Sequence, residues 1–330
     1  MDVIKDNTDW ETLAKLVKKK KKTKAGRPSD YKDEQMLRLV ILQDREDILY
    51  DTDMERKLRR NKGYRDFCDL GKKVPSHDTI TRFKKRLAPE KWKNMFDRLD
   101  EELDECDYFK DDNLAGDGTD IPLPEHVKIG SWGAKSNKKK FFGLWLMTMN
   151  STRRDITRDF NIGSAKVGQI PLMKELLFNM EIPNIHKLDL YMILDGIFDT
   201  HDIRQVIYRK HGKIPLIPYN PRNSDIKKAK NLSDDNWRLV FTPSIRNEEK
   251  FEEQSKPRIA VERENSRLKW WTLIGRLYEK ARIACRITGR YLVNQMIISL
   301  IATQVSALAE WVNQKGQTII KQLNLLAFVG

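Results

Sequence analysis

Three acidic residues of this sequence are suited to chemistry by their type and by the elements that carry them. Asp195 ends a short apolar run, 187–194, and the run stops at Gly196, which is the pattern of a buried strand. Asp117 lies inside a second predicted strand, and Glu262 lies on a predicted helix. Converging carboxylates repel one another unless divalent cations neutralise them, and two Mg²⁺ ions held by such acids can drive phosphodiester chemistry.

Two cations accompany Glu262 on its predicted helix. Arg258, Glu262 and Lys269 are spaced so that they fall within about 40° of one another around a helix axis. A carboxylate flanked by two cations is suited to a site that holds phosphates. The alternative is ordinary ion pairing along one helix.

Neighbouring acids compete with these three for a role in the site. Strand alternation turns Asp120 to the face opposite Asp117. Asp199 follows the strand at the start of a helix that either Asp199 or Thr200 is expected to cap. Helical phase turns Glu264 about 200° away from Glu262. We therefore expect the carboxylates of Asp117, Asp195 and Glu262 to approach closely enough to share metals about 3.5–4 Å apart, and to be somewhat splayed when no metal is bound. The alternative for Asp195 alone is a turn or a cap.

The elements that must position the acids follow an α/β order. Three strands that we expect to be antiparallel are followed by a helix, a parallel strand, a second helix and a further strand; we place them at 113–122, 141–149, 155–162, 164–180, 187–194, 200–211 and 214–217. This is the order of an RNase H-like mixed sheet flanked by helices. In that fold the first strand lies beside the fourth, which would bring Asp117 next to Asp195. A helix beginning at Pro257 is expected to run on towards Arg286.

The charge balance points to a polyanionic partner. The 330 residues include 62 Lys and Arg against 48 Asp and Glu, which gives a net charge of +14. Basic residues that are in excess and clustered in the sequence favour nucleic acid as the binding partner. The alternative is a soluble protein whose positive charge only reflects an organism with lysine-rich proteins. A block around Lys19, Lys20 and Lys21 is expected to be disordered and to contact phosphates, or else to be only a solvated tail.

The N-terminal part of the chain predicts an all-α domain that resembles a helix-turn-helix. Short amphipathic helices lead to one at 76–87 that Ser76 would cap, with Ile80, Phe83 and Leu87 on its apolar face. Its other face is predicted to carry basic and polar residues, which are His77, Thr79, Arg82, Lys84, Lys85 and Arg86. We interpret this basic face as DNA-binding; the alternative is a solvent-exposed surface.

The cysteine content and the hydropathy of the sequence restrict the cellular compartment that we expect for the protein. Cys68, Cys106 and Cys285 are far apart and odd in number, which argues against structural zinc and a disulfide framework and fits a reducing compartment. The N-terminus has no apolar signal core. The uncharged stretch 291–309 is interrupted by amide and hydroxyl side chains, so we interpret it as a buried helix and expect no membrane association.

These motifs together resemble those of DDE-class insertion-sequence transposases. Residues 31–38 through 74–83 resemble the family's N-terminal helical domain, and Asp117-Gly118-Thr119 resembles its first acidic motif. Residues 194–200 resemble the second motif, and 261–269 resemble the third. The resemblance covers about residues 30 to 290. In two places the chain departs from the family pattern: Ser255 stands where the family has Tyr, and Gly196 where a basic residue often follows the second Asp.

The resemblance implies a function and its components. A transposase of this class cleaves DNA at transposon ends and joins the 3′-hydroxyls to target DNA, with two Mg²⁺ ions, replaceable by Mn²⁺, on Asp117, Asp195 and Glu262. Arg258, Lys269 and Arg263 would contact DNA. The implied partners are double-stranded terminal repeats and target DNA, bound by a homodimer in the prokaryotic cytoplasm at the nucleoid. The alternatives are a noncatalytic DNA-binding protein and a metal-dependent nuclease that does not join ends.

The same reasoning divides the chain into segments. We expect the chain to begin with a basic tail, followed by a helical DNA-binding domain and its connector. A catalytic domain comes next, which a polar insertion interrupts, and a short tail ends the chain. The predicted bounds are 1–29 for the basic tail, 30–108 for the helical domain, 109–218 and 257–313 for the catalytic domain, 219–256 for the insertion, and 314–330 for the last tail.

Overall fold

The computed structural model describes residues 2–17, 30–110, 112–136, 139–181, 191–218, 220, 253, 255–283 and 288–315. The chain forms two compact units. One unit combines residues 1–108 with 268–330, and the other consists of residues 109–267. We refer to them as the helical unit and the sheet unit.

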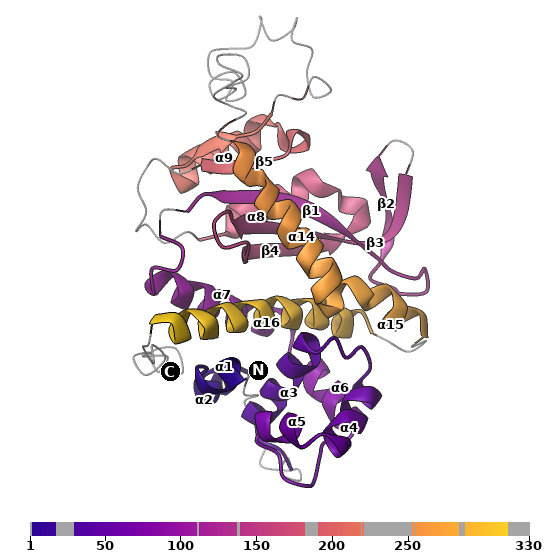
Figure 1. The fold of residues 1–330 in the computed structure, drawn as a ribbon. Coiled ribbons are helices and arrows are strands. Elements are labelled where there is room, and N and C mark those ends of the chain that lie inside the picture. The colour runs from indigo at the N-terminus through magenta and orange to yellow at the C-terminus, as the bar shows by residue number, and fades with distance from the viewer. Residues whose placement is uncertain are drawn as a thin grey trace, which may run out of the picture. The chain divides into compact units, whose positions relative to one another are not determined.

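The sheet unit is built on a mixed sheet whose strands follow the predicted RNase H-like order (Figure 1). The strands are β1 (Leu114–Pro122), β2 (Ser131–Ser136), β3 (Lys139–Ser151), β4 (Thr157–Ser164), β5 (Tyr191–Leu194) and β6 (Ile214–Leu216). β1 is antiparallel to β3 and parallel to β5, which is parallel to β6. β2 and β4 pair with successive halves of β3. β2 is an addition that the sequence pattern did not predict.

Each face of the sheet packs against different helices. Successive residues of a strand point to opposite faces. Met192 and Leu194 of β5 therefore join the core cluster of α8 (Gln169–Asn179) and α9 (His201–His211). Ile193 joins the opposite cluster with Val261 of α14 (Ile259–Trp271). The sheet thus has an α8–α9 face and an α14 face (Figure 1).

Helix α9 begins and ends through local capping. The Thr200 hydroxyl accepts a hydrogen bond from the Ile203 N–H at 3.3 Å. At the other end Gly212 has a left-handed backbone with φ of 60°, which glycine adopts without a Cβ penalty. Asp199, which the sequence placed at a cap, instead accepts from the buried Arg204 Nε at 3.0 Å. Thr200 is therefore the cap, and Asp199 holds the helix from its flank.

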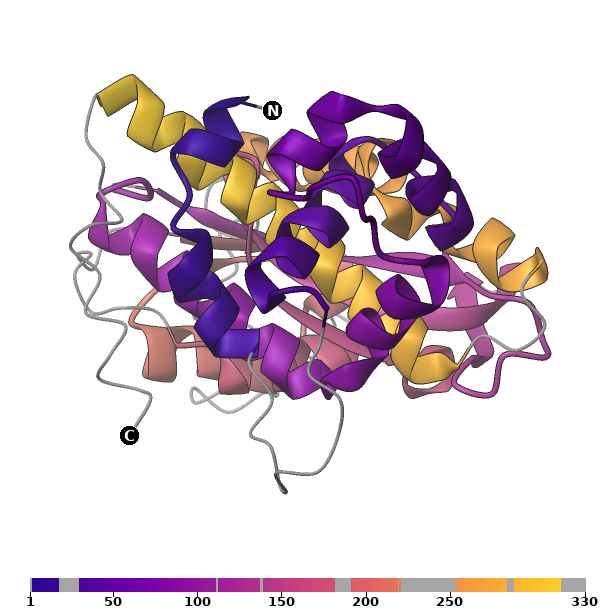
Figure 2. The same ribbon diagram turned by 90° about the horizontal axis from the view of Figure 1, so that it is seen from below.

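The helical unit gathers both ends of the chain around one long helix. Its helices are α1 (Asp2–Asp6), α2 (Trp10–Val17), α3 (Asp33–Arg45), α4 (Asp51–Arg60), α5 (Lys62–Phe67), α6 (His77–Arg86), α7 (Pro89–Glu105), α15 (Leu277–Ile283) and α16 (Gly289–Lys315). α16 packs against α1, α3, α6 and α7, and Figure 2 shows it, in yellow, beside the indigo and purple N-terminal helices.

Helix α16 contains the uncharged stretch 291–309. By length and hydropathy it could cross a membrane, but 89% of its most apolar window is buried in the structure. Its polar side chains are buried as well; Asn294, for example, donates to the Lys84 carbonyl at 2.7 Å and to the Leu87 carbonyl at 3.0 Å. The prediction of a buried core helix is therefore confirmed.

The helix that carries Glu262 is shorter than predicted. It follows the single turn η3 (Lys256–Arg258), and it ends at Trp271 rather than near residue 286. Thr272 takes an extended backbone, and its hydroxyl donates to the Leu268 carbonyl at 2.6 Å while accepting from the Ile274 N–H at 3.2 Å. The turn η4 (Leu273–Arg276) then brings Gly275 so close that a Cβ there would lie 1.8 Å from the Lys269 carbonyl oxygen. A hydroxyl cap and a glycine thus redirect the chain.

Candidate active site

Two of the predicted acids lie on neighbouring parallel strands. The register pairs Gly116 of β1 with Leu194, the last residue of β5. Asp117 is the next residue of β1, and Asp195 directly follows the end of β5. The predicted adjacency of these two strands is confirmed. Ala115 and Ile193 belong to the cluster on the α14 face, and by strand alternation the residues two further on, Asp117 and Asp195, point to that face as well.

Helix α14 and the turn before it bring the third acid and a cation to this face. Arg258 lies 3.4 Å from Asp195, measured from Nη1 to Oδ1, and 3.5 Å from Glu262, measured from Nη2 to Oε1. One guanidinium therefore bridges the strand acid and the helix acid. Asp195 and Glu262 are both well exposed, with side-chain exposures of 52% and 62%, so these are surface ion pairs of modest strength.

The carboxyl of Asp117 lies deeper than the other two. Burial raises the pKa of Asp117 to about 6, and the negative charges of Asp195 and Glu262 add to the rise. The Gly118 N–H, which donates to Asp117 Oδ1 at 2.7 Å, and the Arg258 guanidinium act in the opposite direction. All three acids and Arg258 therefore lie within electrostatic reach of one another.

The competing acid on α14 points elsewhere. Glu264 is fully buried, forms an ion pair with Arg267, and accepts from the Thr157 hydroxyl of β4 at 3.3 Å. Burial raises the pKa of Glu264 to about 7. Glu264 therefore fixes α14 to the sheet, as helical phase predicts. Asp120 lies on β1 an odd number of residues from Asp117 and so on the opposite face.

Asn265 is a further residue at this place that the sequence did not single out. It lies one helical turn after Glu262, and its Nδ2 donates to Asp117 Oδ2 at 3.5 Å. Its Oδ1 is buried and has no hydrogen-bond partner among the described residues. The spacing of three from Glu262 was the available signal, because residues three apart share a helix face.

The donor set fits a hard divalent cation, although the acids are not drawn together around one. Among the residues that the structure describes, no group of three or more His, Cys, Asp or Glu side chains is close enough to hold a metal ion. In the structure Arg258 bridges Asp195 and Glu262, and the approach of the three carboxylates around a metal stays a prediction. Carboxylate oxygens with the partnerless amide oxygen of Asn265 are the ligand type that Mg²⁺ and Mn²⁺ prefer.

The other cations predicted near the third acid have distinct surroundings. Arg263 donates to both oxygens of Asp155, from Nε at 2.8 Å and from Nη2 at 2.7 Å, so it anchors α14 to the turn before β4. Lys269 lies on the same helix as Glu262, seven residues further on.

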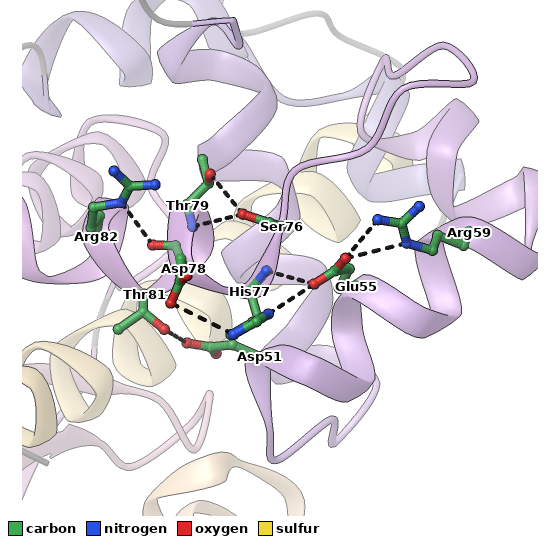
Figure 3. Close-up of polar contacts among 9 residues, drawn as sticks. All are labelled: Asp51, Glu55, Arg59, Ser76, His77, Asp78, Thr79, Thr81 and Arg82. Carbon is green, nitrogen blue, oxygen red and sulfur yellow. Dashed lines mark hydrogen bonds and ion pairs between the residues drawn. The ribbon is translucent and has the colours of Figure 1, made fainter. Parts of the chain in front are cut away.

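The predicted DNA-binding helix is α6, and Ser76 caps it as expected (Figure 3). The Ser76 hydroxyl accepts from the Thr79 N–H at 3.4 Å. Glu55 of α4 accepts from the backbone N–H of His77 at 2.8 Å and from Arg59 Nη2 at 2.7 Å. These bonds, those of Arg59 first, lower the pKa of Glu55 to about 2. The start of α6 is thus held against α4 by a charged hydrogen-bond network.

The basic face of α6 is narrower than predicted. Arg82 is exposed, and its Nε donates to the Asp78 carbonyl of its own helix at 3.2 Å. Lys85 is half-buried over the Tyr291 ring, and Arg86 donates to Asp33 at 2.7 Å. The placement of Lys84 on this face is wrong. Its position, one residue after Phe83 and four after Ile80, turns its side chain into the core.

Several expectations fall on residues outside the described part of the chain. These are the lysine block with Lys19, Lys20 and Lys21, residues 187–190 before β5, most of the insertion 219–256, Cys285, and the last tail.

Comparison with protein-family models gives two matches. Residues 1–86 match the family described as Transposase domain (DUF772). Residues 109–293, more than half of the chain, match the family described as Transposase DDE domain. Neither the curated proteins nor the solved structures give a match.

Proposed function

Because the chain belongs to the DDE transposase family, we propose that it cleaves DNA at transposon ends and transfers the 3′-hydroxyls to target DNA by a two-metal mechanism. Members of this class act on DNA and use divalent metal ions. In the proposal Asp117, Asp195 and Glu262 are the metal ligands, with Mg²⁺ as the ion and Mn²⁺ as a substitute.

One observation carries the assignment of residues. Asp117 and Asp195 follow directly on paired residues of adjacent parallel strands, and Arg258 contacts both Asp195 and Glu262. Three acids from three separate elements of the sheet unit thus come together on the α14 face of the sheet, beside the carboxyl end of β5. The carboxyl ends of parallel strands are where open α/β sheets bind their ligands.

The residues of this chain have separable tasks in that mechanism. Bound divalent cations supply an activated oxygen nucleophile and neutralise charge on the leaving oxygen. Asp117, on the interior of β1, is the rigid ligand because Gly118 N–H and Asn265 Nδ2 hold its two oxygens. Asp195 and Glu262 are more exposed and can adjust. Arg258 and Lys269 hold phosphate oxygens of the DNA.

The remaining contacts are assigned to backbone binding. Arg82, Lys85 and Arg86 of α6, Arg263 of α14 and the lysine block with Lys19, Lys20 and Lys21 bind phosphates of the terminal repeats or target. We place the reaction in a DNA-bound homodimer at the nucleoid of a prokaryotic cytoplasm.

The test is a cleavage assay with DNA that carries the transposon end. We expect Asp195→Asn to reduce Mg²⁺-dependent cleavage at least about 100-fold, because a lost metal ligand removes several kcal/mol of transition-state stabilisation. The matched control is Asp202→Asn, which removes an exposed acid of the same sheet unit that pairs with Lys174. Equal cleavage by wild type and Asp195→Asn contradicts the proposal.

The products of the same assay separate the alternatives. Joined strands identify a transposase, whereas cleaved ends without joined product identify a nuclease. A protein that binds ends but whose function survives replacement of Asp117, Asp195 and Glu262 together by Ala is a noncatalytic DNA-binding protein.

A further inference from the structure

The amide of Asn265 contacts Asp117 through its nitrogen, and its oxygen has no partner among the described residues. Its Nδ2 donates to Asp117 Oδ2 at 3.5 Å. Its Oδ1 is buried and has no partner among the described residues. The amide nitrogen must face Asp117, because in the flipped orientation the amide oxygen would face the carboxylate, and two hydrogen-bond acceptors repel each other.

A buried acceptor without a donor costs free energy, and most buried polar atoms in proteins are satisfied. Residue 265 lies on α14 between Glu262 and Leu268, where leucine is an equally good or better helix former. Local helix stability therefore does not account for an amide at this position. Its oxygen has no donor among the described residues and so remains available to accept a hydrogen bond from a bound group.

The neighbours of Asn265 restrict what that group can be. Asp117, Asp195 and Glu262 are acceptors when ionised, and the guanidinium of Arg258 contacts Asp195 and Glu262. An anion or a neutral acceptor would be repelled by the acids. A hydrated divalent cation is attracted by the same acids and carries water molecules that are strong donors.

We propose that Asn265 is a positioning residue of the metal site, whose Oδ1 accepts a hydrogen bond from a water molecule of the bound cation while its Nδ2 holds Asp117. This inference rests on the proposed function and adds a residue to it. Partners in the outer shell of a metal site orient the ligands and contribute to affinity, so removal of one weakens metal binding about 10- to 100-fold.

The test uses the full chain and MgCl₂ alone, without DNA, and measures both calorimetric Mg²⁺ affinity and melting temperature. Asn265→Leu removes donor and acceptor at similar size. We expect an equal or higher melting temperature without metal, because the partnerless oxygen is gone, and Mg²⁺ binding at least about 10-fold weaker. Asn265→Asp keeps an acceptor, so we expect it to retain Mg²⁺ binding but to melt lower without metal, because a further carboxylate joins the acids.

A matched control replaces an asparagine on the other face of the sheet. Asn161 Nδ2 donates to the Leu172 carbonyl at 3.1 Å and to Glu175 Oε2 at 3.0 Å. Asn161→Leu should lower the metal-free melting temperature and leave Mg²⁺ affinity unchanged. The two Asn→Leu variants are thus expected to change opposite quantities.

Two outcomes overturn the inference, and a third overturns the proposed function. Wild-type Mg²⁺ affinity in Asn265→Leu shows that the amide does not serve the metal. A lower metal-free melting temperature in Asn265→Leu shows that the amide serves the fold. If Asp195→Asn binds Mg²⁺ as tightly as wild type, the metal site itself is misassigned. Loss of binding in Asp195→Asn with wild-type binding in Asn265→Leu contradicts the inference alone.

Discussion

The buried cluster around Asp51 in the helical unit and the open site around Asp117 in the sheet unit hold acids and cations in opposite proportions. Asp51 is nearly inaccessible, and it accepts from Lys84 Nζ at 2.8 Å and from the Thr81 hydroxyl at 2.6 Å, with Lys280 Nζ at 3.9 Å. Burial alone would raise the pKa of Asp51, but Lys84 and Lys280 outweigh it and hold that pKa well below its usual range.

At the other site the balance is reversed. Burial raises the pKa of Asp117 to about 6, and the neighbouring carboxylates of Asp195 and Glu262 add to the rise. Arg258 contacts the two exposed acids but forms no ion pair with Asp117 among the described residues. A cluster whose charges are compensated internally stabilises the fold. A cluster with surplus acid leaves negative charge that cations from solution can neutralise, as we propose for the site around Asp117.

Among the variants that test the difference between the two clusters, we expect Lys84→Met to change the free energy of unfolding most. Its Nζ donates to Gln43 Oε1 at 2.7 Å as well as to Asp51, so the change leaves a buried carboxylate short of its main partner. We expect a loss of about 3 kcal/mol or more in the free energy of unfolding, measured with urea. Lys85→Met, one residue away and half-buried, is the control and should change it by less than about 1 kcal/mol. Similar effects of the two variants would contradict a structural role for the cluster.

A second, smaller effect concerns pH and Lys280. Burial first, and then the charge of Lys84, lower the pKa of Lys280 to about 7. Above that pH the folded protein releases a proton that the unfolded chain keeps until about pH 10.5, so stability should rise with pH. We expect a gain of about 1–2 kcal/mol between pH 7 and pH 9 in wild type. In Lys280→Met this gain should disappear; an unchanged pH profile would show that Lys280 is not the group responsible.

Asp117→Asn tests whether the surplus of negative charge at the open site destabilises the metal-free protein, because it removes one of the acids. A carboxyl whose folded pKa is raised contributes stability below its unfolded pKa and loses it as pH rises through the folded pKa of about 6. Without metal at pH 7, we therefore expect the variant to be more stable than wild type by about 1 kcal/mol, and at pH 4 to be equal to it. The measurement is thermal unfolding at both pH values with a chelator. A variant less stable than wild type at pH 7 would mean that the ionised carboxylate is already compensated.

The smallest effect is expected from Arg258→Gln, which is the counterpart of Lys84→Met at the open site. Both changes remove a cation between acids, but the contacts of Arg258 with Asp195 and Glu262 are exposed. We expect a change of less than about 0.5 kcal/mol in metal-free stability. A loss as large as that in Lys84→Met would mean that the open site is also structural.

The sequence predicted the parts of the site that depend on local periodicity. Strand alternation and strand order placed Asp117 and Asp195 on adjacent strands, and helical phase separated Glu262 from Glu264. These features follow from backbone geometry that every strand or helix shares. The adjacency of the two strands, in contrast, was predicted from the RNase H-like order of the elements, which defines how distant strands pair.

The features that the sequence did not predict depend on distant partners or on short segments. The strand β2 is six residues long with a bulge near Ala134, and its pattern gives no alternation to detect. Lys84 was assigned to a surface because lysine is rarely buried. Its helical position four residues after Ile80 pointed to the core, but its distant partners Gln43 and Asp51, which make burial of the charge possible, were not visible in the sequence. Helix α14 ends where the Thr272 hydroxyl bonds to the backbone. The amino-acid composition around Thr272 does not indicate that a helix ends there.

The helical unit has a consequence for how the protein is made. Its N-terminal helices α3, α6 and α7 pack against α16, which leaves the ribosome last among the described helices. About 180 residues separate α7 from α16, so at about 5–20 residues per second the first helices wait about 10–40 s for the helix that covers them. A truncated transcript that ends after the codon for Glu262 but before α16 would yield a chain whose N-terminal helices lack the helix against which they pack. Only a chain translated through α16 can therefore assemble the part of the protein that we expect to bind the transposon end.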